Sequence, residues 1–121
     1  MAKILITDDS FMMRDLISEI VKRYGHSVEQ ASSGEELLEM YAKEKTDLVI
    51  LDLVMMGMSG LNALDKLMEM DKDAKVLVCS AMAGQKEIAD DAMKRGARAV
   101  INKPFSANEL STIIQRELGV E

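Results

Sequence analysis

The chain has few of the residues that build disulfide-rich, nucleic-acid-binding or membrane-spanning proteins. Among its 121 residues there are one cysteine, one proline, one histidine and no tryptophan. The lone Cys79 forms no disulfide within the chain, which excludes a disulfide scaffold and favours a reducing, cytoplasmic setting. Fifteen basic and 21 acidic side chains leave a net charge of −6. Nucleic acid is therefore excluded as a partner, because its phosphates require a basic face.

Long apolar segments are also missing. No run of residues approaches the roughly 20 apolar positions that a membrane-spanning helix needs. The residues ahead of Asp8 are too few for a signal peptide, and no repeat, linker or low-complexity stretch divides the chain. We therefore expect one monomeric domain over residues 1–121, without insertion into a membrane.

Short apolar runs alternate with segments of helical periodicity. Residues 4–6, 48–51 and 76–79 are continuously apolar, which is typical of strands covered on both faces, and a shorter run lies at 100–101. Residues 27–31 alternate polar with apolar, which suits an edge strand. The segments between the runs carry apolar residues at helical spacing. This pattern predicts an α/β fold, a doubly wound five-stranded parallel sheet with helices on both faces and the flavodoxin-like strand order 2-1-3-4-5.

Local signals mark where the helices begin and end. Two Ser-x-x-Glu sequences, at 33–36 and 106–109, predict capping boxes at helix starts. Gly25 and Gly96 lie where helices should end. His26 follows the first of these glycines in a turn, and we expect it to face solvent.

Polar residues follow the apolar runs at the points where the strands end. These residues are Asp8 and Asp9 after the first run, Asp52 after the third segment, Ser80 after the fourth and Lys103 after the fifth. The carboxyl ends of parallel strands meet at one edge of a sheet, so these side chains should converge. Two carboxylates about 5 Å apart repel by roughly 3 kcal/mol at an effective dielectric near 20. Three of them favour a bound cation, and oxygen ligands of this kind suit Mg²⁺.

Asp52 differs from the other acids because it stands alone at the end of the predicted central strand. A carboxylate there can act as a nucleophile and accept a phosphoryl group as an acyl phosphate. Phosphoryl transfer mainly needs positioning and neutralisation of the phosphoryl oxygens. The Lys103 ammonium and the Ser80 hydroxyl are suited to that task. Taken singly, each of these residues is more simply a cap, a turn or a solvated side chain, and it is their joint placement that favours function.

Together these residues resemble a known family. Four motifs occur in order along the whole chain: Asp8-Asp9-Ser10 with Arg14, the segment 52–60, Ser80-Ala81, and Lys103-Pro104-Phe105. They resemble the receiver domain of two-component response regulators, and because nothing follows the fifth helix the chain is similar to the stand-alone chemotaxis type, CheY. The resemblance implies a phosphoacceptor signalling protein that is not an enzyme beyond its own phosphorylation and slow autodephosphorylation.

The resemblance also implies a role for each residue. Asp52 would be the phosphoacceptor. Mg²⁺ would be bound directly by Asp9, Asp52 and the backbone carbonyl of Val54, and through water by Asp8. The phosphoryl oxygens would meet Ser80, Lys103 and the backbone of Val54 and Ala81. The Lys103–Pro104 peptide bond would be cis.

Partners follow from the same resemblance. A CheA-like histidine kinase would donate the phosphoryl group, a motor-switch or adaptor protein would receive the signal, and a phosphatase is a further candidate. Phosphorylation would draw in Ser80 and Lys103 and shift a pre-existing equilibrium of the fourth strand, fourth helix and fifth strand.

Three departures from the family pattern affect these expectations. Val100 replaces an aromatic residue whose orientation usually reports phosphorylation, so output should depend on Ser80 and the loop after it. Met56 replaces a proline, which should loosen its loop. Val54 and Met82 are both apolar and should shield the phosphoryl group from water, which predicts a long-lived phospho-Asp52.

Four alternatives remain open. The chain could be a phosphorelay intermediate, or a receiver cut from a longer regulator. It could be a Mg²⁺-dependent phosphohydrolase of the haloacid-dehalogenase type, which the lone acid on the third strand and the lack of chain for a cap disfavour. It could be an adaptor that keeps only the fold, which the full set of acids and Lys103 disfavour.

Overall fold

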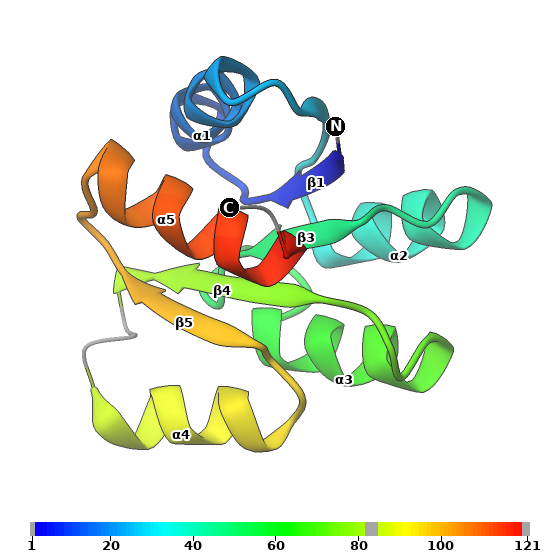
Figure 1. Ribbon diagram of the computed structural model, residues 1–121. Coiled ribbons are helices and arrows are strands. Elements are labelled where there is room, and N and C mark those ends of the chain that lie inside the picture. The colour runs from blue at the N-terminus through cyan, green and yellow to red at the C-terminus, as the bar shows by residue number, and fades with distance from the viewer. Residues whose placement is uncertain (1, 82–84, 120–121) are drawn as a thin grey trace.

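The computed structural model describes residues 2–81 and 85–119 and consists of a five-stranded sheet covered by helices on both faces (Figure 1). The strands are β1 (Lys3–Thr7), β2 (Ser27–Ala31), β3 (Leu48–Leu51), β4 (Val76–Ser80) and β5 (Ala99–Asn102). The helices are α1 (Phe11–Arg23), α2 (Gly34–Lys43), α3 (Gly60–Met70), α4 (Lys86–Lys94) and α5 (Ala107–Leu118).

The strand order is β2-β1-β3-β4-β5 and every neighbouring pair is parallel. This confirms the predicted order. Helices α1 and α5 cover one face of the sheet, and α2, α3 and α4 lie on the other (Figure 1). All strands run in one sense, so their carboxyl ends form one edge of the sheet.

The central strands are buried on both faces. Successive side chains of a strand point to opposite faces. Ile4 and Ile6 accordingly pack in the core under α1 and α5, whereas Leu5 packs in the core against α2 and α3. All four residues of β3 are at most 1% exposed. Continuous apolar runs therefore marked the interior strands correctly, and the alternating β2 lies at the edge.

The predicted helix signals are confirmed with one correction. The sequence 106–109 forms a full capping box in which Ser106 and Glu109 exchange hydrogen bonds. Ser33 also caps its helix, but the Glu36 carboxylate accepts from the N–H of Ser32, at 2.6 Å, instead of the N–H of Ser33. The hydrogen bond from Glu36 back to the start of the helix is thus displaced by one residue, because Glu36 accepts from the N–H of Ser32.

The prediction that His26 faces solvent is wrong. The residue is only 7% exposed. Its Nδ1 accepts the N–H of Ala2 at 3.1 Å, and its Nε2 lies 2.8 Å from Oε1 of Gln115 on α5. Because Nδ1 accepts, Nε2 carries the proton and donates to Gln115. The sequence around His26 is typical of an exposed turn, but α5 covers it through Gln115, which lies 89 residues later in the chain.

Two helices end at glycines, as the sequence predicts. Gly25 and Gly96 have φ values of 87° and 115°, which confirms that the preceding helices end in conformations suited to glycine.

Among the described residues, no helix combines the length and the apolar character required to cross a bilayer.

Candidate functional site

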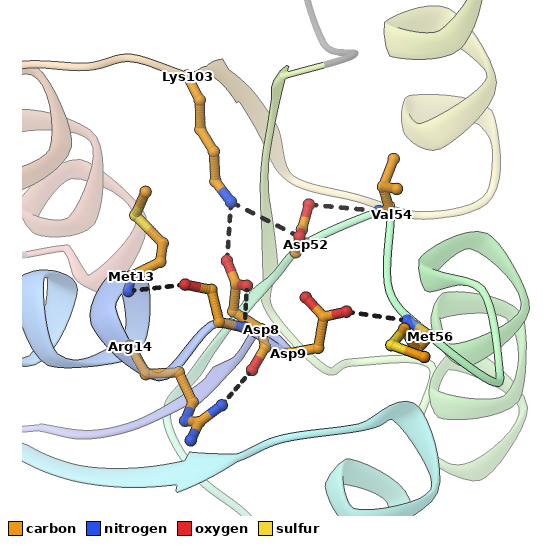
Figure 2. Close-up of polar contacts among 9 residues, drawn as sticks. Asp8, Asp9, Met13, Arg14, Asp52, Val54, Met56 and Lys103 are labelled. Atoms are coloured by element: carbon orange, nitrogen blue, oxygen red, sulfur yellow. Dashed lines mark hydrogen bonds and ion pairs between the residues drawn. The ribbon is translucent and has the colours of Figure 1, made fainter.

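Side chains from three strand ends meet at the carboxyl edge of the sheet (Figure 2). Asp8 and Asp9 follow β1, Asp52 follows β3, and Lys103 follows β5. One ligand oxygen from each of the three acids lies within 4.8 Å of the others. The convergence expected from the sequence is therefore present for these four residues.

Asp8 is the most firmly held of the acids. It is 2% exposed, and its two carboxylate oxygens accept from the N–H of Ser10 at 2.9 Å and from Lys103 Nζ at 2.7 Å. Its backbone is held as well, because its N–H donates to the carbonyl of Ala31 and its carbonyl accepts from Arg14. With both carboxylate oxygens engaged by the protein, Asp8 is suited to reach a cation through water.

Asp9 is exposed and is tied to the loop after β3. Its Oδ2 accepts the backbone N–H of Met56 at 3.0 Å (Figure 2). Proline has no N–H, so the residue that the family usually carries at this position could not make the bond. The substitution that was expected only to loosen the loop thus also supplies a contact between the loop and the acidic cluster.

Asp52 lies at the end of the central strand and is 7% exposed. Its Oδ1 accepts from the N–H of Val54 at 3.3 Å, and its Oδ2 lies 3.6 Å from Lys103 Nζ. Burial raises the pKa of Asp52 above its ordinary value, and the charge of Asp8 adds to this, while Lys103 acts in the opposite direction. A carboxylate crowded by another acid in a partly dry site favours cation binding, because a cation stabilises the ionised form.

Lys103 supplies the ammonium that contacts these acids. Burial alone would lower its pKa, but the hydrogen bond to Asp8 and the charges of Asp52 and Asp8 together place the pKa above the ordinary value for lysine. The ammonium therefore stays charged. The Lys103–Pro104 peptide bond is cis.

Ser80 and Ala81 lie at the end of β4, between β3 and β5. Ser80 is fully buried and pairs in register with Asn102, and its carbonyl accepts the N–H of Lys103 at 3.1 Å. Ala81 is exposed. The neighbouring Cys79 is a buried thiol whose pKa is raised by burial to about 12, so it remains protonated and unreactive.

The residues that depart from the family pattern fall in different environments. Val100, in register with Val78 of β4, is half-buried and packs against the core on the α2 and α3 face. Val54 is 60% exposed. Met82, which we expect to shield the phosphoryl group, lies outside the described residues.

The donor set fits a hard divalent cation. Three carboxylates offer oxygen ligands, and Mg²⁺ binds such ligands while retaining several waters. Two contacts at this site were missed from the sequence, namely the Met56 N–H on Asp9 and the Arg14 guanidinium on the Asp8 carbonyl. Only the missing proline hinted at the first, and nothing in the spacing indicated the second.

Comparison with known proteins agrees with this geometry. A family model of the response regulator receiver domain matches residues 4–115. The chemotaxis protein CheY of Listeria monocytogenes is 42% identical over 117 residues, which are 96% of this chain and 98% of the relative. The sporulation initiation phosphotransferase F of Bacillus subtilis is 31% identical over 119 residues, 98% of this chain and 95% of the relative.

Solved structures share the fold. A chain in the CheX–CheY–BeF3–Mg²⁺ complex of Borrelia burgdorferi superposes with a TM-score of 0.92 at 29% identity, covering 98% of this chain and 90% of that one. NtrX of Brucella abortus gives a TM-score of 0.92 at 32% identity and 98% coverage of this chain. The chain spans only 27% of the NtrX structure, so the receiver fold also occurs within a much longer protein.

Proposed function

Since the chain belongs to the response regulator receiver family, we propose that it is a signalling phosphoacceptor whose Asp52 takes a phosphoryl group from a histidine kinase in a Mg²⁺-dependent reaction. One observation carries the proposal. Three carboxylates offer ligand atoms within 4.8 Å of one another, and the Lys103 ammonium lies 2.7 Å from Asp8 and 3.6 Å from Asp52.

The proposed reaction makes Asp52 the nucleophile. A carboxylate oxygen of Asp52 forms a bond to phosphorus while the phosphorus–nitrogen bond of the donor phosphohistidine breaks, and the departing imidazole keeps the electron pair and takes up a proton. Bound Mg²⁺ supplies neutralising charge for the phosphoryl oxygens. Asp9, Asp52 and the Val54 carbonyl would hold the ion directly, and Asp8 would act through water.

We expect the Lys103 ammonium to move when negative charge is added at Asp52. In the unphosphorylated protein its ammonium contacts Asp8 more closely than Asp52. Once the phosphoryl group adds negative charge at Asp52, the ammonium would move toward the phosphoryl oxygens. The Ser80 hydroxyl and the backbone of Val54 and Ala81 would complete their binding.

The signalling context is proposed from the relatives. Single receiver domains over the full length of the CheY relatives support a single receiver over residues 1–121 here, in the cytoplasm and in chemotaxis. A CheA-like kinase would be the donor, and a motor-switch or adaptor protein would bind the switched face of β4, α4 and β5. The CheX–CheY complex of Borrelia burgdorferi supports a further protein partner, for which we propose phosphatase action.

A second role has its own support. The similarity to sporulation initiation phosphotransferase F favours a phosphorelay intermediate, which passes its phosphoryl group on to another histidine. The two roles differ in the fate of phospho-Asp52. Transfer of label from the phosphorylated chain to a histidine-containing protein would favour the relay, whereas a phosphorylation-dependent complex without transfer would favour the chemotaxis role.

We also propose that phospho-Asp52 is long-lived, because Val54 and Met82 cannot orient an attacking water. The double variant Val54→Asn with Met82→Glu should release phosphate faster than the wild type. Rapid loss of the label from the wild type without a phosphatase would contradict this proposal.

The acceptor role is tested with a small phosphodonor and intact-mass measurement. The wild type should gain one phosphoryl group in the presence of Mg²⁺ and none after chelation. Asp52→Asn should gain none in either condition. Steady turnover of the donor would instead indicate a phosphohydrolase, and equal uptake by Asp52→Asn would exclude Asp52 as the acceptor.

A further inference from the structure

We propose that Arg14 is a positioning residue for the acidic cluster, which it holds in shape by anchoring the backbone between Asp8 and Asp9. The inference rests on the proposed function and adds to it a residue from α1 that touches none of the three carboxylates in the described contacts.

Arg14 connects three segments of the chain. Its Nη1 donates to the Asp8 carbonyl at 2.7 Å (Figure 2), and its Nε donates to Gln30 Oε1 on β2 at 3.1 Å. Gln30 in turn donates through Nε2 to the hydroxyl of Ser18 on α1, at 3.1 Å. The guanidinium also lies over the ring of Phe11, 5.8 Å from its centroid. A planar group with donors in a fixed fork is well suited to hold two acceptors in one arrangement.

The Asp8 carbonyl belongs to the peptide unit that joins the first two acids. The Asp8 N–H is already fixed on the carbonyl of Ala31, at 3.2 Å. With Arg14 on the carbonyl, the backbone is held on both sides of Asp8 at the point where β1 ends. A hydrogen bond from a charged donor is stronger than a neutral one, so Arg14 contributes much of this restraint.

Asp9 depends most on that restraint. Asp8 has three contacts besides the Arg14 bond, whereas Asp9 is exposed and is held by the Met56 N–H. The direction of its carboxylate therefore follows the orientation of the peptide before it. Rotation of that peptide would move Asp9 away from Asp52 and open the cluster.

The charge and the hydrogen bonds of Arg14 act in opposite directions on cation binding. The positive charge of the Arg14 guanidinium near the three carboxylates repels Mg²⁺. Loss of that charge alone should therefore strengthen Mg²⁺ binding. Loss of the hydrogen bonds should weaken it, because removal of groups that orient metal ligands costs about tenfold or more in affinity. Weaker Mg²⁺ binding after loss of Arg14 therefore indicates a positioning role, whereas stronger binding indicates that only its charge matters.

The test is Mg²⁺ binding by titration calorimetry, without phosphodonor, for the wild type, Arg14→Met and Arg23→Met. Arg23 is an exposed arginine in the last turn of the same helix and is the matched control for loss of one charge. Arg14→Met should bind Mg²⁺ about tenfold more weakly. Arg23→Met should bind as the wild type does. Equal or tighter binding by Arg14→Met would overturn the inference.

Two further measurements make the result decisive. The backbone amide NMR signals of Asp9 and Met56, recorded without Mg²⁺, should shift in Arg14→Met and stay in place in Arg23→Met. Should Arg14→Met fail to fold, Gln30→Met removes one acceptor while keeping the charge, and should weaken binding about two- to threefold, a part of the tenfold loss. Unchanged binding by Gln30→Met would then overturn the inference.

The same titration separates this inference from the proposed function. If the wild type neither binds Mg²⁺ nor takes up a phosphoryl group, the proposed function fails. If the wild type does both and Arg14→Met binds Mg²⁺ as well as it does, only the role of Arg14 fails.

Discussion

The two edges of the sheet carry polar groups of opposite character. At the amino edge, most of the polar side chains that line a groove of about 540 Å³ have local partners. His26 pairs with Gln115, Tyr41 donates to Asp71 at 2.8 Å, and Lys75 donates to a backbone carbonyl of α5. At the carboxyl edge, three carboxylates meet one ammonium among the described residues.

This difference separates folding from function. Pairs that satisfy each other stabilise the folded chain, because a buried polar group is costly only when it lacks a partner. An excess of one charge lowers stability until a ligand of the opposite charge binds. The polar groups of the amino edge thus pair with one another, whereas the acids of the carboxyl edge outnumber the ammonium, an excess that the proposed cation would neutralise.

The largest effect should follow from loss of the Lys103 ammonium, which contacts Asp8 and Asp52 at the carboxyl edge. Lys103→Ala leaves Asp8, which is 2% exposed, without its ion pair. Breaking a buried pair in this way typically costs about 3–5 kcal/mol, and urea unfolding without Mg²⁺ should show a loss near the lower end. Saturating Mg²⁺ should restore part of it. A loss that Mg²⁺ does not reduce would contradict the charge argument.

At the amino edge, removal of a partner should destabilise the protein independently of Mg²⁺. Tyr41→Phe removes the hydrogen bond to Asp71 and should cost about 1.5–2 kcal/mol, as for other bonds to charged groups. The bond to Tyr41 holds the pKa of Asp71 below its ordinary value, so its contribution is present at neutral pH and lost as the pH falls through the acid range. Urea unfolding at pH 7 and near pH 3 should show the difference between variant and wild type shrinking with acidification.

At the carboxyl edge, removal of an acid should instead stabilise the metal-free protein. The pKa of Asp52 is raised on folding, chiefly by burial, so the ionised carboxylate costs folding free energy above that pKa. Asp52→Asn removes this cost and should therefore unfold with a larger free energy than the wild type at pH 7 without Mg²⁺. The gain should vanish when the pH falls below the ordinary pKa of aspartate, since both states are then protonated.

Thermal unfolding over pH 3–7, without and with Mg²⁺, measures this gain. Mg²⁺ should raise the melting temperature of the wild type more than that of Asp52→Asn. A variant that is less stable than the wild type at pH 7 without Mg²⁺ would show that the two edges do not differ as described.

The smallest effect concerns the loop after β3. Met56→Pro removes the N–H that donates to Asp9 and should weaken Mg²⁺ binding about two- to threefold, which corresponds to roughly half a kcal/mol. Met56→Leu keeps the N–H and is the matched control. Titration calorimetry on both variants checks the result, and tighter binding by Met56→Pro would mean that the amide competes with the cation.

The features that the sequence predicted depend on periodicity and on the ends of strands. The continuous apolar run of β3 marked a strand buried on both faces, and Asp52 was placed at the site because parallel strands end at one edge. These inferences need no knowledge of which helix packs where. They extend to the whole fold because strand and helix alternate without interruption.

The features that the sequence did not predict depend on contacts between distant segments. The burial of His26 follows from the approach of α5, and the contact of Arg14 with the Asp8 carbonyl follows from the packing of α1 against β1 and β2. Glu36 reached Ser32 instead of Ser33 because a long side chain selects among neighbouring donors by geometry. None of these contacts produces a periodic pattern in the sequence from which it could be predicted.

The most direct test of the account is a crystal structure of the protein with Mg²⁺ and beryllofluoride, a mimic of the phosphoryl group. We predict beryllofluoride on the Asp52 carboxylate, Mg²⁺ on Asp9, Asp52 and the Val54 carbonyl, and the Lys103 ammonium moved from Asp8 to a fluoride. Beryllofluoride on another residue, or a Lys103 ammonium still paired with Asp8 in a fully occupied site, would contradict the account.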